Sequence, residues 1–343
     1  MKKRGFASTV FFLLIFLFAI LAAPAESEKK IAKKAGKLMA KALEAINQKQ
    51  TDLAIDLLNQ TLALTPNNAV VHHNLGVMLH QKGLIDEAIA SFEKALRLQP
   101  DYQHAQLALH QTLFEAGKSA SSKQEFEKSN GYLLKFRDLP YTYVGKENDT
   151  MLAWARYILG FNFFNLKQYP QAQANFELCQ AMEGMEKENL GLYANATYFL
   201  GLIHSINKQY DNSNVNFKKY LTLFVAMEKK PELYAQANYF IAVNLFQQLE
   251  AKLAKGEVAG LAEAAAEIMP YLEEAIANKL PNEDAHVMLG NCHVYRKEYD
   301  KALQVYQQLI EAFPQSPQLK SYQVFMQELQ KMQKQAEKPK KKR

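Results

Sequence analysis

Three histidines in the first third of the chain have a spacing that could place them on one helical surface. His73 and His80 lie seven residues apart, which puts two side chains on the same face of a helix, and His104 follows in the next segment. Imidazole is a common ligand of zinc and copper. No carboxylate or cysteine accompanies the three at ligand spacing, so solvated or partner-facing histidines are the ordinary interpretation. We predict no metal site.

Cys292 and His293 are the other residues that suggest chemistry, because a cysteine and a histidine can form a nucleophile and base pair. Neighbours on a helix point about 100° apart, however, so these two side chains cannot meet. Glycine-rich phosphate loops, His-Glu-x-x-His helices and Gly-x-Ser-x-Gly elbows are absent from the sequence. Cys179 and Cys292 lie more than a hundred residues apart, about three repeat units, so we expect no disulfide between them. We predict two buried thiols, no catalytic residue, no enzymatic activity and no cofactor.

The charge of the chain is concentrated at its two ends. The protein has 343 residues, of which 48% are hydrophobic and 22% charged, and a formal net charge of +6. Lys2, Lys3 and Arg4 open the chain and the tail 338–343, KPKKKR, closes it, so the body between them is near neutral. A nucleic-acid reader needs a basic stripe on its folded surface, so we predict no nucleic-acid partner. The basic tail could contact an anionic surface or only aid solubility.

Residues 1–25 have the organisation of a secretory signal peptide. A basic start precedes the apolar run VFFLLIFLFAILA, and Ala23 and Ala25 fit the small-x-small rule for cleavage before Glu26. We expect an exported protein, periplasmic or secreted, that has no transmembrane span after cleavage. The alternative is an uncleaved inner-membrane anchor, because residues 6–23 approach the minimum length for crossing a bilayer.

A repeated order of large, small, aromatic and proline residues indicates how the rest of the chain folds. In residues 69–102 the order is Leu75, Gly76, Leu79, Gly83, Ala88, Phe92, Ala95 and Pro100. Similar orders run through Leu159 to Cys179, Leu200 to Phe217 and Leu289 to Pro314, with weaker copies near Ala35, Gln103 and Ala235. Small residues let paired helices approach closely, and proline ends the second helix of a pair. Each pair buries its apolar face only by stacking on the next pair.

This pattern resembles the tetratricopeptide repeat family over about residues 35–315, in some seven units. The resemblance implies an all-α fold, a right-handed superhelical solenoid of antiparallel helix pairs. The spacing departs from the family period of about 34 residues after the third unit. The marker positions Leu109, Leu159, Leu200, Ile241 and Leu289 are 50, 41, 41 and 48 residues apart. We therefore expect lengthened helices or loops in the later units.

The predicted organisation has six parts. They are the signal peptide 1–25, N-terminal repeats 26–140, a linker 141–150, C-terminal repeats with extended helices 151–316, a capping helix 317–337 and the basic tail 338–343.

The resemblance also implies a function, because first helices in this family line a concave groove that binds peptides or proteins. By the repeat register the groove would be lined by Trp154, Tyr157, Phe161, Phe164, Tyr198, Leu202, Tyr239, Val243 and Phe246. Aromatic side chains supply large contact areas at low entropic cost. We expect a non-catalytic protein-interaction scaffold of the bacterial cell envelope. Two alternatives stay open: the rings stack on carbohydrate or peptidoglycan, or some of them fill gaps between widened repeats.

Overall fold

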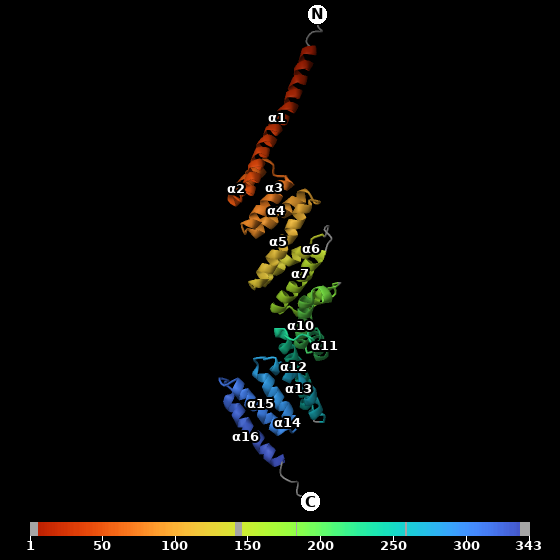
Figure 1. Ribbon diagram of the computed structural model, residues 1–343. Coiled ribbons are helices and arrows are strands. Elements are labelled where there is room, and N and C mark those ends of the chain that lie inside the picture. Colours follow the sequence, from red (N-terminus) through yellow and green to blue (C-terminus); the bar gives the residue numbers. More distant parts are fainter. Residues whose placement is uncertain (1–5, 141–145, 183, 258, 337–343) are drawn as a thin grey trace. The chain divides into compact units, whose positions relative to one another are not determined.

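The computed structural model describes residues 6–140, 146–182, 184–257 and 259–336, and only the backbone of residues 6–26 and 146–148. Over these residues the chain is all-helical and no strand is present (Figure 1). The helices are α1 (Phe6–Asn47), α2 (Thr51–Leu64), α3 (Ala69–Gln81), α4 (Ile85–Leu98), α5 (Gln103–Ser122), α6 (Phe126–Asp138), α7 (Lys146–Asn165), α8 (Tyr169–Gln180), α9 (Met185–Glu188), α10 (Leu190–Ile206), α11 (Tyr210–Thr222), α12 (Glu232–Ala254), α13 (Leu261–Ala277), α14 (Glu283–Tyr295), α15 (Tyr299–Ala312) and α16 (Leu319–Ala336).

The helices pack as consecutive pairs, which confirms the predicted all-α repeat fold. Two compact units divide the chain, one over residues 1–155 and one over residues 156–343. The first contains α1–α6 with the start of α7, and the second contains the remainder. Several predicted segments fall partly outside the described residues: positions 1–5 of the signal peptide, positions 141–145 of the linker, and the basic tail.

One contact recurs inside the helix pairs of both units and accounts for the small residue of the pattern. A Cβ atom added to Gly76 would lie 2.6 Å from the ring of Phe92, sixteen residues further on. The same clash would occur between Gly160 and Phe176, between Gly201 and Phe217, and between Gly290 and Tyr306, at 2.5–2.8 Å. Glycine at this position therefore lets a large side chain of the second helix lie directly on the backbone of the first.

The same contact corrects the register of the third pair. The Cβ position of Gly117 in α5 lies 2.5 Å from Leu133 in α6, so Gly117 is the counterpart of Gly76. The repeat register in the sequence predicts Leu109 as the counterpart of Leu75 in this unit, which is about two helical turns too early. Gly76, Gly117, Gly160 and Gly201 are 41, 43 and 41 residues apart. The period therefore lengthens at the third pair, where α5 is extended, rather than after it.

Six of the turns between paired helices have a left-handed residue seven positions after the small residue, whereas the turn between α12 and α13 has Gly256 in that conformation. In the six turns the residue is Gly83 in the second pair, with φ +84°, and a lysine or glutamine elsewhere: Lys49, Gln124, Lys167, Lys208 and Lys297, with φ between 57° and 62°. The next residue donates its N–H five positions back, as Leu84 does to the Leu79 carbonyl at 2.9 Å. This is the Schellman arrangement that ends a helix and reverses the chain.

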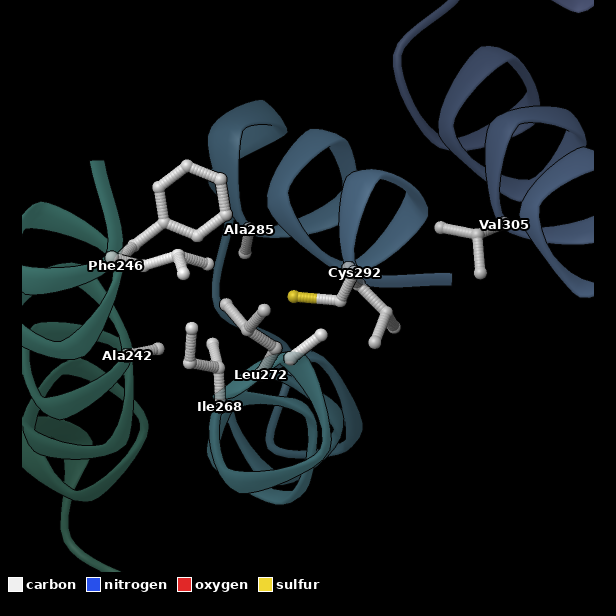
Figure 2. Packing of buried hydrophobic residues seen from close by; sticks show 10 residues of the cluster. Ala242, Phe246, Ile268, Leu272, Ala285, Cys292 and Val305 are labelled. Atoms are coloured by element: carbon white, nitrogen blue, oxygen red, sulfur yellow. The ribbon is translucent and has the colours of Figure 1, made fainter. Parts of the chain in front are cut away.

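Buried clusters join each pair to the next in the second unit. In one of them α12, α13, α14 and α15 meet, and Figure 2 shows Ile268 and Leu272 of α13 between Ala242 and Cys292. A second cluster joins α15 to α16 through Tyr306, Leu309, Tyr322 and Leu329. Tyr322 and Leu329 are the buried residues of α16. Phe325 and Met326 of α16 pack against the same cluster, and most of the other side chains of this helix are exposed.

Candidate functional site

The nine residues predicted to line a groove differ widely in burial. Trp154 is exposed, with 40% of its surface accessible, whereas Tyr198 and Phe246 are buried at 3% and 9%. The remaining six are partly exposed: Tyr157, Phe161, Phe164, Leu202, Tyr239 and Val243. Trp154 belongs to the first unit and the others to the second. Phe246 is part of the cluster in Figure 2, so this ring contributes chiefly to packing.

The phenylalanines of α7 contact a residue that the sequence reasoning missed. Phe199 of α10 has its ring centroid 5.7 Å from Phe161 and 5.2 Å from Phe164, both edge-on. It also stacks on Phe176 of α8 at 5.2 Å, with an interplanar angle of 6°. Phe199 thus joins three helices, and Phe161 and Phe164 each keep only part of their surface free.

The tyrosines of the same face are hydrogen-bonded to side-chain amides of the following first helix. Tyr198 of α10 donates its hydroxyl to Gln236 Oε1 of α12 at 2.8 Å. Tyr157 of α7 is hydrogen-bonded to the side chain of Asn195 in α10. Tyr239 of α12 is likewise bonded to Asn282, the residue that caps the start of α14. Two of these hydrogen bonds therefore link consecutive first helices, and the third links α12 to the residue that precedes α14.

The residues that form these tyrosine–amide hydrogen bonds follow one another along α7, α10 and α12. Asn195 and Tyr198 are three residues apart on α10, and Gln236 and Tyr239 are three apart on α12, so each pair shares a helix face. Phe161, Leu202 and Val243 lie one turn further along α7, α10 and α12 and are partly exposed. We call this set the amide–tyrosine row: Tyr157, Phe161, Asn195, Tyr198, Leu202, Gln236, Tyr239 and Val243.

The row carries no ionised group at neutral pH. Burial raises the pKa of Tyr157 to about 12, although the hydrogen bond from Asn195 opposes that rise. Burial also raises the pKa of Tyr198 and of Tyr239. The guanidinium of Arg156 in α7 donates to the Leu178 carbonyl of α8 at 3.0 Å. Asp284, whose charge raises the pKa of Tyr239 further, marks the α14 end of the row.

The histidines singled out in the sequence do not assemble a metal site. His73 lies 6.3 Å from His104 between ring centroids and 5.2 Å from Tyr102. Burial, and secondarily the charge of His104, lower the pKa of His73. His80 points elsewhere, with Nε2 3.7 Å from a Glu115 oxygen. Across the described part of the chain, no three His, Cys, Asp or Glu side chains gather as metal ligands would.

Cys292 and His293 separate as the helix geometry predicts. Cys292 is buried between α13 and α14, and burial raises its thiol pKa to about 12. His293 instead bonds Glu298 in the following turn, with Nδ1 2.8 Å from Oε2. Cys179 is also buried and forms no disulfide, and burial raises its thiol pKa to about 12. Both thiols stay protonated and are poor nucleophiles at neutral pH.

The first unit contains a separate polar cavity of about 400 Å³ between the α3–α4 turn and the α5–α6 pair. Its lining includes Asp86, Glu115 and Lys128, and Tyr132 donates to Asp86 Oδ1 at 2.6 Å. Acidic and basic side chains are mixed along its wall, so it presents no single charge to a ligand. The cavity is a mixed-charge space between neighbouring helix pairs.

Two segments of the chain match family models of the tetratricopeptide repeat, residues 69–102 and residues 259–323. These two segments are thus similar to tetratricopeptide repeats, and the glycine contacts at Gly76 and Gly290 lie within them. Repeats of this family are generally non-catalytic and bind protein partners. Comparison with curated protein sequences gives no match.

The solved structures that this chain matches have low sequence identity to it. PilF of Pseudomonas aeruginosa is 16% identical, with a TM-score of 0.41, over 75% of this chain and 96% of its own. The C-terminal part of a TPR repeat-containing protein from Cytophaga hutchinsonii is 15% identical, with a TM-score of 0.47, over 82% and 98%. MamA is 21% identical, with a TM-score of 0.37, over 60% and 94%.

Among the residues whose side chains the structure describes, which begin at residue 27, no helix has both the length and the apolar character that a bilayer span requires.

Proposed function

We propose that this helical repeat protein is a non-catalytic scaffold of the bacterial cell envelope that binds a protein partner along its amide–tyrosine row. One observation carries the proposal: consecutive first helices of the second unit present a line of partly exposed apolar side chains and amides. Phe161, Leu202 and Val243 give this line a contact surface that is apolar without being fully buried. Interfaces with such a centre and a polar surround are typical of protein recognition.

The test uses side chains that are accessible, because buried tyrosines would confound binding with stability. Leu202→Ser together with Val243→Ser should abolish capture of the partner in affinity purification from the envelope fraction followed by mass spectrometry. Val215→Ser together with Val225→Ser is the matched control, since both valines are at least 65% exposed on or just after α11. Equal capture by the two double variants would contradict the proposal.

A carbohydrate ligand is less well supported by the geometry. Sugar rings stack on free aromatic faces, and Phe161 and Phe164 are already engaged by Phe199. Trp154 is the exposed ring of the predicted set, at 40%. Quenching of Trp154 fluorescence by peptidoglycan fragments, without any loss in the Leu202 and Val243 double variant, would favour the sugar hypothesis over the protein one.

The envelope location is part of the proposal and depends on the sequence of residues 1–25. The basic start, the apolar run and the Ala23-x-Ala25 site together support export and cleavage before Glu26. The intact mass of the protein recovered from its host should correspond to residues 26–343. A mass that retains the first 25 residues, in a membrane fraction, would instead support the anchored alternative.

A further inference from the structure

We propose that one face of α1 binds the surface of a bilayer that contains anionic phospholipids. We call it the lysine face, and it consists of six lysines: Lys29, Lys30, Lys33, Lys34, Lys37 and Lys41. It is separate from the amide–tyrosine row, because α1 belongs to the first unit and the row to the second. The inference therefore goes beyond the proposed function and does not depend on it.

The six lysines lie on one side of the helix. Successive residues of an α-helix are rotated by about 100°, so these side chains fall within an arc of about 140° over a length of about 18 Å. The other side of α1 packs on α2, and there Ala35, Ala42 and Ala45 are buried. All six lysines are exposed, and within the part of the chain that the structure describes none of them forms an ion pair.

The positive charge is local to this helix. Residues 27–43 contain six lysines and one acidic residue, Glu28. Glu44, which ends the lysine face, accepts a hydrogen bond from Gln48 at 3.2 Å. Residues 44–336 contain five more acidic than basic side chains. An anionic surface therefore attracts α1 and repels the rest of the described chain, which orients the contact.

The residue types favour a bilayer over a nucleic acid. Sites for single-stranded nucleic acid combine cations with aromatic rings that stack on the bases, and arginine suits phosphates held in fixed positions. Residues 27–47 contain neither an arginine nor an aromatic residue. Lysine carries a point charge on a flexible stem, which suits the mobile headgroups of anionic lipids.

The start of the described part of α1 adds an apolar contact. Residues 27–34 are all exposed, because α1 extends past the end of α2 (Figure 1). Ile31 is 41% exposed and lies three residues before Lys34, at the edge of the lysine face. An apolar side chain beside lysines can enter the boundary between headgroups and acyl chains.

The lysine face also follows the apolar run 10–22 on the same helix. Lys29 lies seven residues after Ala22, which is about 10 Å along the helix axis. In a chain that keeps the run in a bilayer, the lysines therefore lie close to the headgroups. A chain cleaved before Glu26 keeps all six lysines and binds by charge.

Co-sedimentation of the chain recovered from its host with lipid vesicles tests the inference. The measured quantity is the ratio of its affinities for vesicles of phosphatidylcholine mixed with phosphatidylglycerol and for vesicles of phosphatidylcholine alone. Insertion of residues 1–25, where they are retained, contributes equally to both affinities and cancels in the ratio. The ratio should exceed about tenfold at low salt and approach one at about 1 M salt, where charges are screened.

Lys33→Gln together with Lys37→Gln should lower this ratio about thirtyfold, because each lysine near an anionic surface contributes about 1 kcal/mol. Lys118→Gln together with Lys123→Gln is the matched control, since it removes the same charge from exposed side chains of the first unit. The control should keep the ratio of the unmodified chain. Both double variants should melt as the unmodified chain does, because all four side chains are exposed.

Two results would overturn the inference. Equal ratios in the two double variants would show that the lysine face is not the contact, as would follow if the basic tail 338–343 bound the lipid. Tighter binding of random single-stranded RNA than of anionic vesicles, lost in the Lys33 and Lys37 double variant, would assign the face to nucleic acid. The Leu202 and Val243 double variant should bind vesicles as the unmodified chain does, so this test and that of the proposed function can fail separately.

Discussion

The pair α3–α4 in the first unit and the pair α10–α11 in the second use the same packing contact in different settings. Gly76 faces Phe92 in one pair, and Gly201 faces Phe217 in the other. In α3–α4 the small residue of the second helix is Ala88. In α10–α11 the corresponding residue is Ser213. The first pair is therefore held at this contact by apolar packing, whereas the second adds polar groups that require partners.

Ser213 finds those partners in its own pair and in the next one. Its hydroxyl donates to the Gly201 carbonyl at 2.8 Å and accepts from Asn244 Nδ2 of α12 at 2.8 Å. Asn244 also donates to Asn214 and accepts from Ser205 at 2.7 Å. Apolar contacts thus define each helix pair, and a buried polar network fixes how α10–α11 meets α12.

The largest expected loss of stability comes from removing the ring that lies on the glycine in each pair, Phe92 or Phe217. Phe92→Ala and Phe217→Ala should each lower the free energy of unfolding by about 3–5 kcal/mol, because both rings are fully buried and leave a cavity. Urea denaturation followed by circular dichroism measures the loss. If one variant were destabilised and the other were not, the two contacts would not be equivalent.

Asn244→Leu should remove the buried polar network that distinguishes α10–α11 from α3–α4. The substitution leaves Ser205, Ser213 and Asn214 without their amide partner in a buried site, which costs about 1–3 kcal/mol. Ser119 in α5 lies two residues after Gly117, at the place that corresponds to Asn244 in α12, and its side chain is exposed. Ser119→Ala should therefore change the free energy of unfolding by less than about 0.5 kcal/mol. Equal losses in the two variants would contradict a special role for the network.

Much of this comparison could be predicted from the sequence, and part could not. The pairing of Gly76 with Phe92 follows from residue types at a fixed spacing of sixteen. The third pair was misplaced because Leu109 keeps the family period, while α5 is extended and Gly117 makes the contact. Asn244 gave no local signal, since its partners are about 30–39 residues away.

The candidate site, too, could be predicted from the sequence only in part. Its position on the first helices of the second unit stays a prediction drawn from the repeat register. The burial of Tyr198 was not foreseen, because a tyrosine on a helix face can bind a partner or bond the next repeat. A signal was present: Tyr157 and Asn195 are 38 residues apart, and so are Tyr198 and Gln236. Phe199 was missed because it lies between two residues that the register assigned to the groove.

The turn after α14 contains an ionisable side chain, Glu298, whose contribution to stability should depend on pH. Glu298 bonds His293 and Arg296 and lies 3.5 Å from Lys301. The hydrogen bonds from Arg296 and His293 lower the pKa of Glu298 from 4.5 to about 2. The equivalent turn after α10 pairs His204 with Gln209, which carries no charge. The two turns therefore differ in two ionisable side chains, since Arg296 and Glu298 correspond to Asn207 and Gln209.

A carboxyl whose pKa is lower in the folded state stabilises the fold above its unfolded pKa and loses that contribution as the pH falls. Glu298→Gln should therefore lower the free energy of unfolding by about 1 kcal/mol at pH 6, after allowance for solvent screening. The difference in the free energy of unfolding between the unmodified chain and Glu298→Gln should shrink from about pH 5 downward and vanish near pH 2. Gln209→Ala should show no such pH dependence. Urea titrations at several pH values measure both.

The smallest effect is expected at the left-handed turn residue, which is Gly83 in α3–α4 and Lys208 in α10–α11. Gly83→Ala should lower the free energy of unfolding by about 1 kcal/mol, because a side chain at φ +84° is strained.

Lys208→Gly should raise it by about 0.5 kcal/mol, since relief of the left-handed strain exceeds the entropy cost of glycine. Lys208 and Gly83 both lie outside the amide–tyrosine row, so neither variant should alter partner capture. Differential scanning calorimetry resolves shifts of opposite sign. Shifts of the same sign would show that the two turns, alike in backbone, are held by different contacts.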